Sequence, residues 1–166
     1  ILNRPLGTAS GTGAIDMSVT AANRVSGLGA RGGDLEVNFG GAGTDVVWGT
    51  TPGFNPAILG LNNSTADSMI TLVNPLDLNG AARVIQVDAN TAVLKGTFKN
   101  GSVTAAALRK TGAGTLEHDP GSSYTTTLTG LNTGGGTLRL GSGNYTLTGS
   151  AATAQPDSTS GFIVSR

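Results

Sequence analysis

The chain has 166 residues, of which 27 are glycine, 12% are charged and 4% are aromatic, and it contains no cysteine. This length suits one domain with its own core, and the lack of cysteine excludes a disulfide framework and a cysteine-based metal site. The ten basic and ten acidic residues cancel and are scattered, which excludes a clustered nucleic-acid interface, and no apolar run approaches the roughly 20 residues of a membrane helix.

Short apolar bursts follow one another along the chain, at 34–39 (DLEVNF), 68–73 (SMITLV), 82–87 (ARVIQV), 92–98 (AVLKGTF), 136–140 (GTLRL) and 144–149 (NYTLTG). Their alternating or β-branched character is typical of strands. Turn signals such as Gly32-Gly33, Asn79-Gly80 and Gly134-Gly135-Gly136 separate them. The best helical window, an Ala-rich run around 103–110, is only one or two turns long. We therefore predict an all-β chain with almost no helix.

Two phrases recur near the end of the chain. Gly114-Thr115-Leu116 returns as Gly136-Thr137-Leu138, and Thr-Leu-Thr-Gly at 127–130 returns at 146–149. Both intervals are about 20 residues, and a nearly fixed period indicates stacked structural units, whereas a catalytic motif is normally needed once. The Asn79–Asn90–Asn100 spacing indicates about ten residues per strand and turn, so two such steps make one repeat.

We predict a right-handed parallel β-helix, a β-solenoid, formed by one domain over 1–166 with its repeat-like part at about 110–149. Leu116, Leu138 and Leu140 are expected to point inward and stack, and Gly114 and Gly136 to let the backbone turn. The alternative is a β-sandwich, which also has short, regularly spaced strands but usually a larger aromatic core.

The phrase KTGAGTL at 110–116, followed by GGGTLRLG at 134–141, resembles the autotransporter-associated β-strand repeat, or passenger-associated transport repeat, of large bacterial surface proteins. Residues 30–49 and 64–87 resemble the segment that often precedes this repeat. The sequence after Leu116, Glu117-His118-Asp119-Pro120, departs from the family pattern, and we expect a turn to cut that coil short. The resemblance implies a secreted or cell-surface, outer-membrane-associated passenger, and we expect the chain to be a piece of something longer.

These features favour an extracellular structural module of a surface or filament protein, with no cofactor and no enzymatic activity. The alternatives are an adhesin or glycan-binding module, whose partners would be surface glycans, and a polysaccharide lyase or hydrolase. Cleavage of a glycan would need carboxylates on one face. Asp67 and Asp88, about one repeat apart with Asp77 between them, could share a face, but turn capping is the more ordinary role of such residues.

Four other features have ordinary explanations. We expect His118, the single histidine, to be exposed beside a turn, on the face opposite Glu117 and Asp119, which argues against a metal site. Trp48 ends the run DVVW and shares a face with Val46, so we expect it to be buried rather than to stack on a sugar; Phe54 follows nearby. The glycosylation sequons at Asn62 and Asn144 are expected to be fortuitous.

The ends of the chain carry apolar residues but no capping helix. A solenoid exposes unpaired backbone groups at its ends. We therefore expect the chain to join itself or adjacent repeats end to end through residues of the two termini, namely Ile1, Leu2, Leu6, Phe162, Ile163 and Val164.

Overall fold

The chain is built from short parallel β-strands, as a computed structural model shows for residues 1–41, 43–99, 107–121, 123, 125–128, 130–142, 144–147, 154–156 and 161–164. For 125–127, 144–147, 154–156 and 161–164 only the backbone is described. No described residue is helical, so the all-β prediction is confirmed.

The largest sheet has seven strands in the order β1-β3-β6-β9-β12-β15-β18. Its strands are β1 (Leu2–Arg4), β3 (Leu35–Phe39), β6 (Ile70–Leu72), β9 (Thr91–Leu94), β12 (Thr115–His118), β15 (Thr137–Leu140) and β18 (Gly161–Val164).

A second sheet has six strands in the order β17-β14-β11-β8-β5-β2. They are β2 (Val25–Leu28), β5 (Ile58–Leu61), β8 (Arg83–Gln86), β11 (Ala107–Thr111), β14 (Gly130–Thr133) and β17 (Ala154–Pro156). The remaining strands form a three-stranded sheet, β4 (Val46–Val47), β7 (Leu76–Asp77) and β10 (Phe98–Lys99), and a two-stranded sheet, β13 (Thr125–Leu128) and β16 (Asn144–Leu147).

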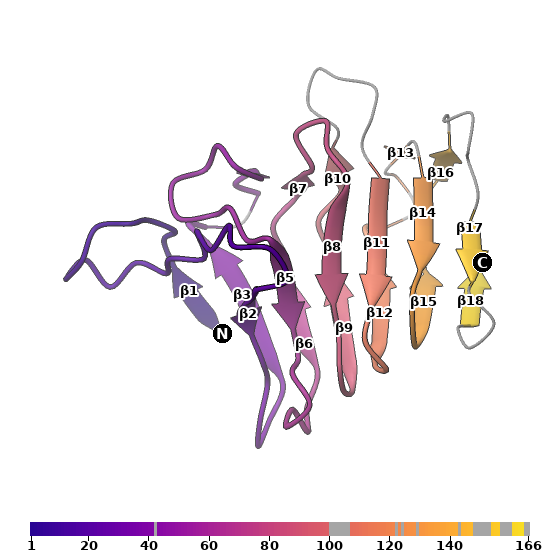
Figure 1. Cartoon of the computed structure of the whole chain (residues 1–166), viewed down its shortest axis with the longest axis horizontal. Helices are drawn as coiled ribbons and strands as arrows, with labels where there is room; N and C mark the ends of the chain where they lie inside the picture. The colour runs from indigo at the N-terminus through magenta and orange to yellow at the C-terminus, as the bar shows by residue number, and fades with distance from the viewer. Residues whose placement is uncertain are drawn as a thin grey trace.

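The chain visits these sheets in a fixed rotation. From β3 onward, a strand of the seven-stranded sheet is followed by one of a short sheet and then by one of the six-stranded sheet, and we call one such passage a circuit. Figure 1 shows the circuits side by side along the long axis, from β1 near the N-terminus to β17 and β18 near the C-terminus. Every pairing between the described strands is parallel, so the antiparallel sheets of the sandwich alternative are absent from the described part of the chain.

The circuits differ in length. Leu35 pairs with Ile70, 35 residues later, whereas Glu117 pairs with Arg139, 22 residues later. The predicted period of about 20 residues is therefore slightly short for the later circuits and misses the long early ones. The turn predicted to cut one coil short does not do so, because β12 extends to His118 and pairs with β15 along its whole length.

Inward-facing side chains of successive strands form columns in the core. One column runs through Ile70, Ala92, Leu116 and Leu138, and the next through Leu72, Leu94, His118 and Leu140. Leu116, Leu138 and Leu140 are all buried, with Leu140 in the column of His118 and not in that of the other two leucines. Burial of such columns is the main source of stability in stacked structures.

An aromatic cluster lies in the core of the early circuits. Trp48 packs edge-on against Phe54 at 5.2 Å between ring centroids, and Phe39 lies 6.4 Å from Phe54. Trp48 is fully buried and its indole nitrogen donates a hydrogen bond to the carbonyl of Pro56 at 2.9 Å. The prediction that Trp48 is buried on the face of Val46 is confirmed, so this ring offers no sugar platform.

Candidate functional site

The carboxylates of the three aspartates considered for catalysis accept hydrogen bonds from nearby backbone or side-chain groups. The Asp67 carboxylate accepts hydrogen bonds from Ser68 Oγ at 2.7 Å and Gly32 N at 2.6 Å, which lower its pKa. Asp77 accepts the backbone N–H of Asn79 at 2.8 Å. The backbone N–H of Asp67 donates to Ala30, whereas that of Asp88 donates to Asn62. Asp67 and Asp88 are therefore not stacked on one another, so they do not form the carboxylate pair considered for glycan cleavage.

His118 is fully buried, so the prediction that it is exposed is wrong. It takes a position that leucines fill in the circuits before and after it, and its ring packs on Phe98 at 4.1 Å between centroids. Nε2 lies 3.0 Å from the carbonyl of Gly96, to which it donates as the neutral tautomer. Burial lowers the pKa of His118 to about 4, against opposing effects of the Gly96 carbonyl and Asp119.

The neighbours of His118 point outward, as the alternation predicts. Glu117 pairs with Arg139 of the next circuit at 3.2 Å, and Asp119 pairs with Lys95 and accepts hydrogen bonds from Ser142. The hydrogen bonds from Lys95 and then Ser142 lower the pKa of Asp119 to about 2. Within the described ranges, no group of three or more His, Asp or Glu side chains could hold a metal ion.

Lys110, the first residue of KTGAGTL, is a charged residue that the sequence pattern did not mark as buried. It occupies a core position between Ile85 and Thr133 and is fully buried. Its ammonium donates hydrogen bonds to the carbonyls of Gly112 and Gly114 in its own circuit and of Gly135 in the next, the last at 2.8 Å. Burial lowers the pKa of Lys110 to about 8, and the charge of Asp88 opposes this. Lys110 is thus a clamp between circuits.

The glycines of the phrase accommodate this clamp. Gly136 has a φ of 64°, and a Cβ there would overlap the Gly114 carbonyl and the Lys110 ammonium. The glycine of the second Gly-Thr-Leu therefore has a structural reason. The strand alternation that places Lys110 on the inward side with Leu108 is the sequence signal for the clamp.

Two buried asparagines make similar links. Asn62 is 1% exposed, accepts from Ala30 N at 2.8 Å and donates to the carbonyls of Ser68 and Thr91. Asn74 binds both the N–H and the C=O of Phe39. Since the Nδ2 of Asn62 is fully used, its sequon is closed in the folded chain; the side chain of Asn144 lies outside the described part.

The residues predicted to make end-to-end contacts are partly engaged within the chain. Leu2 pairs with Val37, and Leu6 forms a bridge with Ile15, while Ile1 is 89% exposed. Phe162, Ile163 and Val164 lie in β18, which pairs with β15, and their side chains lie outside the described residues.

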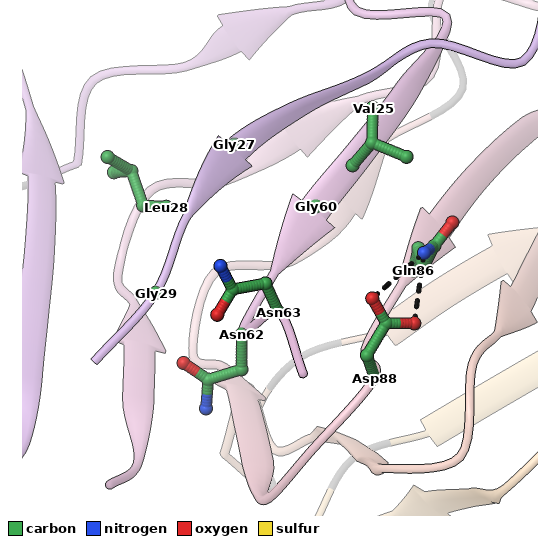
Figure 2. Close-up of a pocket in the computed structure, with 9 residues that line it drawn as sticks. All are labelled: Val25, Gly27, Leu28, Gly29, Gly60, Asn62, Asn63, Gln86 and Asp88. Carbon is green, nitrogen blue, oxygen red and sulfur yellow. Dashed lines mark hydrogen bonds between the residues drawn. The ribbon is translucent and has the colours of Figure 1, made fainter. Parts of the chain in front are cut away.

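A hollow of about 350 Å³ on the outer face of the six-stranded sheet is a candidate binding site (Figure 2). Its floor is Gly27 of β2 and Gly60 of β5, which pair with each other. Neither has a positive φ, and a Cβ on Gly27 would overlap the backbone of Gly60, so close strand contact keeps the floor bare. Val25 and Leu28 contribute apolar surface, and Asn63, Gln86 and Asp88 supply polar groups.

The polar side chains of the hollow are oriented by hydrogen bonds, either to each other or to a neighbouring residue of the same loop. Gln86 Nε2 donates to both oxygens of Asp88, at 2.9 and 3.0 Å (Figure 2). Asn63 Oδ1 accepts from Thr65 N at 3.2 Å and Thr65 Oγ1 at 3.0 Å. Gly27 and Gly29, at alternate positions of the sequence, are the signal from which this hollow could have been predicted.

Comparison of the chain with protein-family models, with curated proteins and with solved structures found no match. Among the described residues there is no helix long and apolar enough to cross a membrane.

Proposed function

We propose that the chain is a right-handed parallel β-helix that serves as a structural module of a bacterial surface or filament protein, located outside the cell. The observation that carries this proposal is the parallel, in-register pairing of each circuit with the next across the two large sheets. Such a stack gives a rod whose length grows with each circuit.

The buried polar side chains support a structural role. Lys110, Asn62 and Asn74 all bond to backbone groups of other circuits or turns, and none is presented to solvent. A polar group that is buried and satisfied in this way fixes the register of the stack. The location at the cell surface rests on the resemblance of KTGAGTL and GGGTLRLG to the autotransporter repeat.

The edge strands favour end-to-end joining. No described strand pairs with the free edge of β1, and β2 is likewise the first strand of its sheet. The carbonyl of Arg4 bonds toward β3, so in a parallel pair the N–H and C=O of the adjacent Asn3 point toward the free edge. We therefore propose that a neighbouring circuit, from a second copy or from the same polypeptide, adds its strand at Asn3.

Replacing Asn3 with proline tests whether a second copy of the chain adds its strand at this edge. Asn3→Pro removes the outward N–H and retains the β1–β3 hydrogen bonds, and Asn3→Ala is the matched control. Sedimentation velocity and electron microscopy should show end-to-end assembly for the wild-type chain and for Asn3→Ala, and a folded monomer for Asn3→Pro. Assemblies of unchanged length in Asn3→Pro, or a wild-type chain that stays monomeric at high concentration, would argue against it.

A further inference from the structure

The hollow between β2, β5 and β8 leaves one donor and two kinds of acceptor open to a ligand. Because the Oδ1 of Asn63 accepts from Thr65, its Nδ2 remains as a donor with no partner among the described residues. The Gln86 amide nitrogen is occupied by Asp88, which leaves its oxygen as an acceptor. A carboxylate accepts about four hydrogen bonds, so Asp88 has capacity beyond its two bonds to Gln86.

These groups border a floor that carries no side chain, formed by Gly27 and Gly60. In Figure 2, Asn63 lies between Gly29 and Asp88, and Gln86 and Asp88 lie together on one side of Gly60. The exposed Val25 side chain, 48% accessible, flanks the floor, so an apolar surface adjoins the polar groups. A ligand that suits this site presents hydroxyl groups at its edge, which both donate and accept, and a ring face of C–H groups to the floor.

The charges near the hollow disfavour an anionic ligand. Asp88 is its single charged lining residue, and no Lys or Arg lines it. A carboxylate on a ligand would face Asp88 without a cation in reach, which costs affinity. The nearby Lys110 ammonium acts on Asp88 but is enclosed by the carbonyls of Gly112, Gly114 and Gly135, so it compensates the charge of Asp88 without contacting a ligand.

We propose that this hollow binds a neutral sugar, with one pyranose ring lying on Gly27 and Gly60 and its hydroxyls bonded to Asn63, Gln86 and Asp88. A volume of about 350 Å³ is at the small end of ligand sites, which suits a single ring of a longer glycan. The proposal does not depend on end-to-end assembly, because every residue of the site belongs to one copy.

Nuclear magnetic resonance titration tests this directly. The backbone amides of Gly27, Gly29 and Gly60 are monitored while methyl glucoside, methyl galactoside, N-acetylglucosamine, glucuronate or calcium chloride is added to the full chain. The expected result is saturable shifts at these amides with at least one neutral sugar and much weaker shifts with glucuronate. No saturable shift with any neutral sugar overturns the proposal, and so does a response to calcium alone.

Two variants and a matched control locate the binding. Gly29→Leu fills the hollow without strain, because Gly29 does not have a positive φ and a Cβ there meets nothing closer than 3.6 Å. Gly130→Leu is the control, since Gly130 alternates with the buried Leu131 on the outward side of the same sheet, away from the hollow. Gly29→Leu and Gln86→Ala should each weaken binding at least tenfold and Gly130→Leu should not. Unchanged binding in both Gly29→Leu and Gln86→Ala overturns the proposed site.

Discussion

The ammonium nitrogen of Lys110 lies 2.8 Å from the carbonyl oxygen of Gly135, which belongs to the next circuit of the chain. Together with the carbonyls of Gly112 and Gly114, this contact links two successive turns of the backbone through one side chain. Glycines of KTGAGTL and of the following GGGTLRLG thus bond to one lysine side chain that joins two circuits.

Removing this ammonium should destabilise the fold. In Lys110→Met the apolar stem is retained but three carbonyls lose their donor, and buried unsatisfied acceptors are costly. We expect the free energy of unfolding, measured in urea, to fall by about 2–4 kcal/mol. Lys95→Met is the control, because Lys95 is about half exposed and its ion pair with Asp119 is worth about 1 kcal/mol or less. Equal stability of Lys110→Met and the wild type would show that the clamp is unimportant.

His118 should make stability depend on pH between about 4 and 6.5. The unfolded imidazole takes up a proton as the pH falls through about 6.5, whereas burial keeps the folded pKa at about 4. The unfolded state therefore binds more protons in this window, and the free energy of unfolding should fall with the pH, by about 3 kcal/mol in all.

The variant His118→Leu isolates this effect. Leucine matches Leu94 and Leu140 in the same column, and it cannot be protonated. Urea unfolding at several pH values between 4 and 7 should therefore show a much flatter profile for His118→Leu than for the wild type. Parallel profiles for the two proteins would mean that His118 is not the group responsible.

Gly136 should tolerate no side chain. Gly136→Ala combines a positive φ with overlap of the new Cβ with Gly114 and Lys110, so we expect a loss of about 3 kcal/mol or more, or no folding. Gly11→Ala is the matched control, because Gly11 has a φ of 78° but a Cβ there would meet no atom within 4 Å. Its loss of stability should therefore reflect only the positive φ, which costs about 1 kcal/mol. Thermal unfolding measures both, and equal losses would exclude the steric reason.

Strands could be predicted from the sequence where apolar and polar residues alternate regularly, as at 136–140. The prediction was wrong or incomplete where contacts between distant parts of the chain determine the structure. Ile58–Leu61 was missed because Gly60 interrupts its apolar pattern, yet it forms a strand held by neighbours on both sides. The 35-residue length of the early circuits was missed because inserted loops separate their strands. His118 looked exposed because Asp119-Pro120 signals a turn, but strand register places its ring in the core.

The candidate site was the least predictable part. The floor of the hollow joins Gly27 to Gly60, and its rim adds Asn63, Gln86 and Asp88, residues that only the stacking of three circuits brings together. Asp88 was singled out from the sequence, but for a pairing with Asp67 that the structure does not form.

The register between circuits is the central claim of this account, and an engineered disulfide tests it most directly, since the chain has no cysteine of its own. Glu117 pairs with Arg139 of the next circuit on the outer face. A parallel pair of this kind brings the two Cα atoms within the range that a disulfide spans. Glu117→Cys combined with Arg139→Cys should oxidise fully to an intramolecular disulfide, seen by mass spectrometry, with wild-type circular dichroism. A folded double variant whose two thiols stay free, or cross-link only between molecules, would contradict the stacked parallel register.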